Sequence, residues 1–129
     1  MAFQVSPGVQ VKEIDATGVI PAVSTSIGGF VGAFNWGPAE EIRLVSSEDN
    51  MASIFSTPDT TTAKYFLTAA SFLKYGNALK VVRVVDSTAR NANVKGNSAL
   101  IIKNEDDFNS TSINSNDVGE FISKYPGFL

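Results

Sequence analysis

The sequence of 129 residues contains no cysteine and no histidine. The absence of cysteine excludes a disulfide scaffold, a thiolate metal site and a cysteine nucleophile. The absence of histidine removes the imidazole metal ligand and the side chain that most often serves as a general base near neutral pH. We therefore expect no metal, no cofactor and no catalytic residue of these kinds.

Positive charge is also scarce, with 10 lysines and arginines against 13 aspartates and glutamates and a net charge of −3. Proteins that bind nucleic acid present a basic face, so we expect no nucleic-acid partner. The uncharged stretch 16–39 is interrupted by Pro21, Pro38 and five glycines, which argues against a transmembrane helix and membrane insertion. No basic segment followed by an apolar one opens the chain, so no signal peptide is expected.

The most regular pattern lies in residues 26–39, where apolar side chains alternate with glycines up to the turn Trp36-Gly37-Pro38. With a period of two, the side chains divide between the two faces of a strand, with Ile27, Gly29, Val31 and Ala33 on one face and Gly28, Phe30, Gly32 and Phe34 on the other. Because both faces are apolar or bare, the pattern predicts a central strand covered on both sides. Three glycines in five residues indicate helices packed closely against the sheet.

Two helices and two further strands are expected in residues 41–85. A short strand at 41–45 precedes a helix that Ser46 or Ser47 caps and whose apolar face holds Met51, Ile54 and Phe55. The pattern next predicts a second helix at 61–75, mostly buried because only a narrow stripe of it is polar: Lys64, Thr68, Ser71 and Tyr75.

A strand at 79–85, rich in β-branched residues, follows the second helix. This order predicts a small layered α/β domain with a mixed sheet, two main helices and its two long strands side by side.

Residues 1–25 do not have the pattern of a packed element. The segment Val9-Gln10-Val11-Lys12-Glu13 alternates as a short strand does, and proline and glycine separate it from the domain expected at 26–129. An isolated strand needs a sheet edge to join. Physical reasoning leaves two alternatives open: an edge strand of the same domain, or an extended arm that adds a strand to another subunit.

After residue 86 the sequence becomes polar. We expect loops at 87–98 and 104–117, a strand at 99–103, and a final short helix that includes Val118, Phe121 and Ile122. The acidic trio Glu105-Asp106-Asp107 lacks the spaced oxygen ligands and the turn glycine of a calcium loop, so a solvated surface is expected there.

A small-molecule-binding or enzymatic α/β domain is an alternative function that depends on two carboxylates. Asp86 follows an expected strand, where ligands bind in open α/β sheets, and Asp15 is the second candidate. The ordinary explanation for Asp86 is that it caps the strand end or pairs with Arg90, and a fold alone does not establish an activity.

Several short motifs occur in a fixed order along the chain: Ser6-Pro7-Gly8-Val9 with Lys12-Glu13, then Asn35-Trp36-Gly37-Pro38-Ala39, Tyr65-Phe66-Leu67, Phe72-Leu73-x-Tyr75-Gly76-Asn77, Lys80-Val81-Val82-Arg83-Val84-Val85-Asp86, and Tyr125-Pro126-Gly127. In order and spacing they resemble the N-terminal part of the tail sheath protein of contractile-tailed bacteriophages of the large myovirus type. The resemblance is strongest over residues 1–90. Members of that family are several times longer, so the resemblance implies that this chain is a fragment.

The resemblance implies a structural subunit, not an enzyme, that polymerises around a tail tube and contracts to drive the tube into the host. Its implied partners are other sheath subunits, the tail tube, and the baseplate and tail-terminator proteins. Its implied location is the virion tail, after assembly in the host bacterial cytoplasm. Terminal arms of this family link neighbouring subunits by sharing strands, which favours the arm interpretation of residues 9–13. A non-contractile adaptor of the tail or baseplate is a further alternative.

Overall fold

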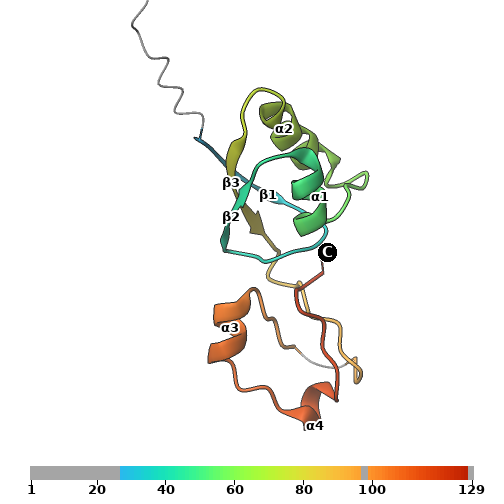
Figure 1. Cartoon of the computed structure of the whole chain (residues 1–129). Helices are drawn as coiled ribbons and strands as arrows, with labels where there is room; N and C mark the ends of the chain where they lie inside the picture. The colour runs from blue at the N-terminus through green and yellow to red at the C-terminus, as the bar shows by residue number, and fades with distance from the viewer. Residues whose placement is uncertain (1–26, 97–98, 128–129) are drawn as a thin grey trace, which may run out of the picture.

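The computed structural model describes residues 27–96 and 99–127. Seven elements follow one another along the chain: β1 (Ile27–Ala33), β2 (Ile42–Val45), α1 (Glu48–Phe55), α2 (Ala63–Leu73), β3 (Ala78–Val84), α3 (Glu105–Ser110) and α4 (Ser115–Val118). The first five form a sheet with two helices packed on it, and α3 and α4 belong to a C-terminal segment beyond one end of the sheet (Figure 1).

The three strands lie in the order β1-β3-β2. β1 runs parallel to β3, with Val31 opposite Val82, and β2 runs antiparallel to β3, with Ile42 opposite the same valine. The predicted α/β class, the mixed sheet and the pairing of the two long strands are therefore confirmed.

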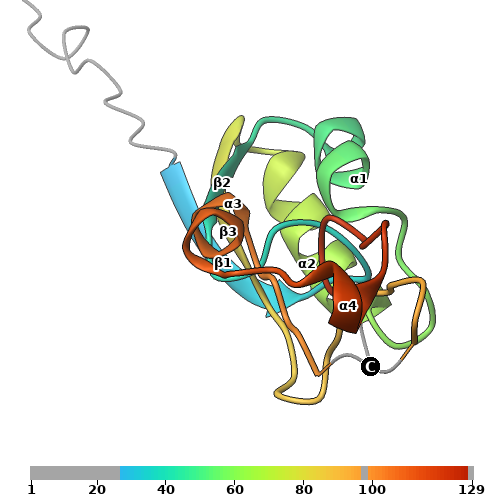
Figure 2. The ribbon, with the colours of Figure 1, turned by 90° about the horizontal axis from the view of Figure 1, so that it is seen from below.

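The predicted position of the first strand in the sheet is wrong. β1 pairs only with β3 among the described residues, so it is an edge strand, and β3 is the central one. Its two faces also differ, because Phe34, just beyond the strand, is buried and Gly32 faces the helices, whereas Ile27 and Val31 are 64% and 63% exposed. Both α1 and α2 lie on the same side of the sheet (Figure 2). An apolar pattern on both faces predicts that both can be covered, but the described chain covers one.

Helix α1 confirms the predicted cap and apolar face. The Ser47 side chain accepts a hydrogen bond from the Asn50 amide at 3.2 Å, which satisfies one of the free amides of the first turn. Met51 and Phe55 are buried against the sheet, and the helix ends at Phe55, after which Ser56 has a φ of 65°.

Helix α2 occupies the centre of the predicted range. A carboxylate oxygen of Asp59 accepts hydrogen bonds from the amides of Thr61 and Thr62, both at 2.8 Å, and fixes the turn before the helix. The expectation that α2 is mostly buried is wrong for Leu67 and Phe72, which are exposed because the described chain packs against only one side of the helix.

The core lies between the sheet and these two helices. The buried side chains of this cluster come from the strands, the helices and the turn after β1: Phe34, Val45, Met51, Phe55, Phe66, Ala69, Ala70, Leu79 and Val81. Phe34 stacks on Phe55 with ring centroids 4.7 Å apart, which joins the end of β1 to the end of α1.

The C-terminal segment differs from its predicted structure. Residues 99–103 form no strand, and the predicted loop at 104–117 contains α3 and all of α4 except its last residue, Val118. Asn104 and Asn114 cap these helices by accepting hydrogen bonds from amides of their first turns, which local polarity alone did not reveal. α4 ends at Val118, before Phe121 and Ile122, so the predicted final helix is shorter than expected and lies earlier.

Candidate functional site

The residues predicted to form the intersubunit arm lie outside the described residues. They are Val9, Gln10, Val11, Lys12 and Glu13, and the candidate Asp15 lies in the same undescribed segment. The described residues present three kinds of candidate site: the faces of the sheet, its edges and the C-terminal segment.

The sheet face opposite α1 and α2 is an exposed surface, which we call the open sheet face. It is defined by eight residues: Ile27, Gly29, Val31, Ile42, Leu44, Lys80, Val82 and Val84. In the strand register Val31, Val82 and Ile42 form one row across the three strands, and Gly29, Lys80 and Leu44 form the next. Ile42 and Leu44 are 65% and 62% exposed, so aliphatic side chains of all three strands face outward together.

The sheet also has two edges to which a strand could add. Among the described residues, β1 and β2 each pair with β3 alone, so the outer edge of each has no strand partner there. Backbone groups at a free edge can hydrogen-bond an extended peptide, as in β-strand addition.

Arg83 joins the sheet to the turn after β1 and to the C-terminal segment. Its side chain is fully buried and donates hydrogen bonds from Nε to the Phe34 carbonyl at 2.8 Å, from Nη1 to the Gly37 carbonyl at 2.8 Å, and from Nη2 to the Pro126 carbonyl at 2.9 Å. Burial lowers the pKa of Arg83 to about 10, so the guanidinium remains charged at neutral pH. Carbonyl dipoles surround this charge.

A second set of contacts holds residues 91–123 together and against the turn at Ala39. The Asn91 amide group donates to the Ser123 carbonyl at 2.9 Å, and its oxygen accepts from the Ile102 amide at 2.7 Å. The Ala39 amide donates to the Lys103 carbonyl at 2.8 Å, and Lys103 pairs with Glu40 at 2.7 Å. The segment is thus attached to the turn at Ala39 by a backbone hydrogen bond and an exposed ion pair.

Asp86 has a structural role in its turn. One carboxylate oxygen accepts hydrogen bonds from the Thr88 hydroxyl at 2.7 Å and from the Thr88 amide at 2.8 Å, and these bonds lower the pKa of the carboxyl group. The suggested pairing with Arg90 is not formed, because that guanidinium donates to the Ser87 and Ala89 carbonyls. The carboxylate caps the turn after β3.

The acidic trio Glu105-Asp106-Asp107 forms the first turn of α3, where negative charge is favourable. Asp107 accepts a hydrogen bond from the Lys103 amide at 3.0 Å. Within the described residues, no group of three acidic side chains is arranged to hold a metal ion.

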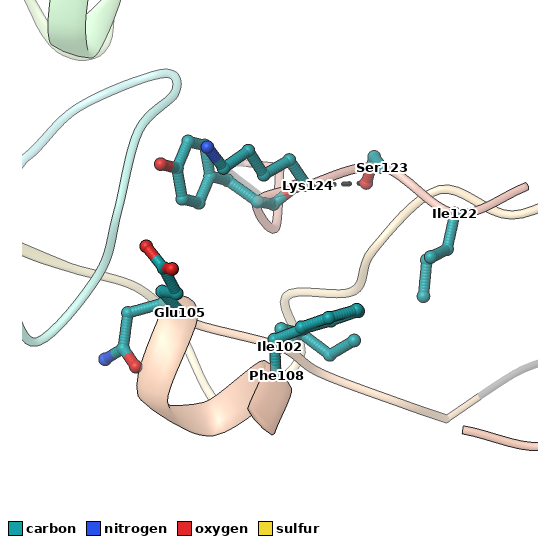
Figure 3. Close-up of a pocket in the computed structure, with 8 residues that line it drawn as sticks. Ile102, Glu105, Phe108, Ile122, Ser123 and Lys124 are labelled. Carbon is teal, nitrogen blue, oxygen red and sulfur yellow. Dashed lines mark hydrogen bonds between the residues drawn. The ribbon is translucent and has the colours of Figure 1, made fainter. Parts of the chain in front are cut away.

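The C-terminal segment contains a pocket of about 380 Å³. It is lined by Ile102, Asn104, Glu105, Phe108, Ile122, Ser123, Lys124 and Tyr125. Figure 3 shows Glu105, Ile102 and Phe108 on one side and Ser123 and Lys124 on the other, with the Ser123 hydroxyl bonded to the Tyr125 carbonyl at 3.0 Å. The lining offers apolar contact and two charges of opposite sign, without a nucleophile placed beside a base.

Each helix formed by residues 27–96 and 99–127 is too short or too polar to cross a bilayer.

Sequence reasoning missed two features of these surfaces. Arg83 was treated as one residue of an apolar strand, although its alternation with Leu79 and Val81 places it on the covered face. The open sheet face was read as covered. The sequence pattern that indicates the open sheet face is the alternation of Ile42 and Leu44 with Arg43, which extends the apolar surface to β2.

Comparison with known proteins gives consistent matches. Residues 25–84, which include the sheet and its two helices, match the family described as the domain III N-terminal region of tail sheath protein Gp18. The tail sheath protein of Vibrio phage KVP40 is 47% identical over 88 residues, covering 67% of this chain and 13% of the relative. That of Enterobacteria phage T4 is 42% identical over 94 residues, covering 71% of this chain and 14% of the relative.

The tail sheath protein of Salmonella phage ViI is 37% identical over 130 residues, covering 99% of this chain. The chain spans 13% to 20% of the length of these relatives. The resemblance inferred from the sequence is therefore confirmed, and the chain is a relative of bacteriophage tail sheath proteins whose sheet and first two helices match the N-terminal region of domain III.

Proposed function

We propose that this chain is the N-terminal part of a structural subunit of a contractile bacteriophage tail sheath. The subunit polymerises around the tail tube and contracts to drive the tube into the host. The observation that carries the proposal is the similarity to the ViI tail sheath protein along 99% of the chain.

The chemistry of the described residues supports a structural role over an enzymatic one. Asp86, the best carboxylate candidate, is engaged by Thr88 in a local turn. Arg83 is buried among carbonyl oxygens and is out of reach of a substrate. The prominent surface is an apolar sheet face, which is suited to packing against protein.

Residues 1–25 are proposed to be an extended arm whose strand, Val9 to Glu13, adds to the sheet of a neighbouring subunit. Adding a strand supplies main-chain hydrogen bonds that an isolated strand lacks, because ordering each backbone residue costs about 1–2 kcal/mol. The outer edges of β1 and β2, which have no strand partner among the described residues, support this proposal. The edge that receives the strand belongs to the neighbouring subunit.

The proposed partners are other sheath subunits, the tail tube, and the baseplate and tail-terminator proteins, without nucleic acid or membrane insertion. The proposed location is the virion tail, after assembly in the host bacterial cytoplasm. The energy of contraction is stored in alternative packings of the subunits, since an assembly with two stable arrangements needs no catalytic residue.

A chimera tests the proposal. This chain replaces the matched segment of the ViI tail sheath protein, and the tagged product, called the sheath chimera, is produced together with unmodified ViI subunits. We expect electron microscopy and sedimentation to find the tag in assembled sheaths. A control chimera without residues 1–20 is expected to fold and to remain outside them.

A sheath chimera that melts cooperatively and yet stays out of every assembly would contradict the proposed function. Incorporation of the control without residues 1–20 would contradict the role of the arm alone.

A further inference from the structure

Gly29 lies in the middle of an edge strand, and no contact within the described residues explains why this position is a glycine. A Cβ atom added at Gly29 meets no described atom within 4 Å, and its φ lies outside the left-handed range that favours glycine. Glycine weakens a strand interior and usually marks the close approach of another backbone. The glycine therefore indicates the close approach of a backbone that does not belong to the described residues.

The other two glycines of β1 show what such a neighbour looks like. A Cβ atom at Gly28 would lie 2.7 Å from the Phe72 ring, and one at Gly32 would lie 3.2 Å from Cβ of Tyr65. Both contacts are with α2 or its side chains, so these glycines allow a helix to pack closely on the covered face. Gly29 points to the opposite face, where no described helix lies.

The residues around Gly29 have the composition of a buried surface. Val31, Val82 and Ile42 form an aliphatic row across the three strands. All-parallel sheets are almost always covered on both faces, and β1 and β3 form a parallel pair within this mixed sheet. Within the open sheet face Lys80 is the one charged member, and it lies in the register row of Gly29.

We propose that the open sheet face is a docking surface for an amphipathic helix from the remainder of domain III in a sheath polypeptide. The apolar stripe of that helix packs on the row of Val31, Val82 and Ile42, its backbone approaches Gly29, and a carboxylate of the helix pairs with Lys80. This inference rests on the proposed function, since it takes its occupant from the sheath polypeptide.

The family match is the argument for this occupant. The match covers only the N-terminal region of domain III. The segment aligned with this chain is at most 20% of the length of each relative, so most of a sheath polypeptide lies outside it. The sheet and its two helices already form two layers, so a helix from the remainder of the domain would add a third layer and bury the apolar open sheet face.

The charge on the surface argues against a second copy of the chain as the occupant. Lys80 is on the central strand, so two open sheet faces packed across a two-fold axis would bring two lysines together in an apolar interface. Neither would have an opposite charge from the other face, and burial of unpaired charge is strongly unfavourable.

Cysteine labelling tests the proposal directly, because the chain contains no cysteine of its own. Val31→Cys places a thiol on the open sheet face, and Thr68→Cys places a control thiol on the exposed side of α2. Both variants are prepared in the 129-residue chain and in the sheath chimera, with cysteines of the ViI part changed to serine. Maleimide reacts with each in dilute solution.

We expect Val31→Cys to react as fast as the control in the 129-residue chain and on the order of 100-fold more slowly in the monomeric sheath chimera, where reaction requires local opening. Fast reaction in the monomeric chimera overturns the proposal, including the case in which the thiol becomes protected only after assembly. Slow reaction in the dilute 129-residue chain also overturns it, since the face is then covered by this chain itself or by a second copy.

A second measurement applies if the sheath chimera does not fold. In the 129-residue chain, Gly29→Val should leave the thermal midpoint unchanged or raise it, whereas Gly32→Val should lower it. A loss at Gly29 equal to that at Gly32 would show that the glycine is required within this chain, and would overturn the inference.

The two proposals fail separately. A sheath chimera protected at position 31 but excluded from sheaths contradicts the proposed function and supports the docked helix. A chimera that assembles into sheaths while position 31 stays reactive supports the proposed function and contradicts the docked helix.

Discussion

Removing the Arg83 guanidinium should destabilise the chain and release its C-terminal segment. We call Arg83 and the carbonyl groups of Phe34, Gly37 and Pro126 the clamp. Arg83→Met retains an unbranched, shorter side chain but leaves these three carbonyl oxygens without their Arg83 donors. A buried carbonyl left without a hydrogen-bond donor costs about 1–3 kcal/mol, so three of them give a gross loss of up to roughly 3–9 kcal/mol. Removing a buried charge recovers several kcal/mol of desolvation. We expect a net decrease of about 2–4 kcal/mol in the free energy of unfolding.

Urea denaturation followed by the fluorescence of Trp36 measures this decrease. Trp36 is the single tryptophan and lies edge-on to Tyr125 with ring centroids 5.8 Å apart, so its emission also reports on the C-terminal segment. Arg83→Lys serves as the matched variant. It keeps the charge but lacks the planar fork of donors, so an intermediate loss is expected.

Hydrogen exchange locates the effect of Arg83→Met. The amides of Ser123 and Gly127 donate to the Ala92 and Arg90 carbonyls, and both should exchange faster in the variant while β3 stays protected. An Arg83→Met variant as stable as the parent, with unchanged exchange at these two amides, would refute the clamp as an attachment of the C-terminal segment.

Three further predictions concern packing and capping in residues 27–75. Gly32→Val should lower the free energy of unfolding by about 1–3 kcal/mol, because the new side chain meets Phe30 and Tyr65; an unchanged urea midpoint would contradict the close packing of α2. Phe66→Ala should cost about 3–5 kcal/mol, whereas Lys64→Ala on the exposed side should change stability by less than about 0.5 kcal/mol; equal effects would show that the faces of α2 are misassigned. Hydrogen bonds from Thr62 lower the pKa of Asp59 below 3.8, so its contribution to stability is present above that pH and is lost as the pH falls through the folded-state pKa. Asp59→Asn should therefore flatten the fall of the thermal midpoint below pH 3.8, and a curve parallel to that of the parent would count against the cap.

The sequence predicted the elements that depend on local chemistry. Ser47 as a cap and the apolar face of α1 follow from residues close together in the chain. The pairing of the two long strands follows from the order of strands and helices along the chain. The order of the motifs also predicted the family, because it depends on residue identity and spacing alone.

Features that depend on distant segments were not predictable in the same way. The apolar pattern of β1 predicted cover on both faces, but whether a face is covered depends on elements elsewhere in a polypeptide. The donors of Arg83 reach carbonyls 43 to 49 residues away, so no local pattern identifies the clamp. α3 and α4 were missed because short helices capped by asparagine have the same polar composition as a loop.

The most direct test of the central proposal is hydrogen exchange at Val9 and Val11 of the sheath chimera, measured in the dilute monomer and in assembled sheaths. If residues 1–25 are an exchanged arm, both amides exchange rapidly in the monomer, because an unpaired strand cannot offset the loss of backbone entropy, and slowly in the assembly. Slow exchange at both positions in the dilute monomer would show that the strand pairs within its own subunit, and fast exchange in assembled sheaths would show that it pairs with no subunit at all; either result would contradict the account.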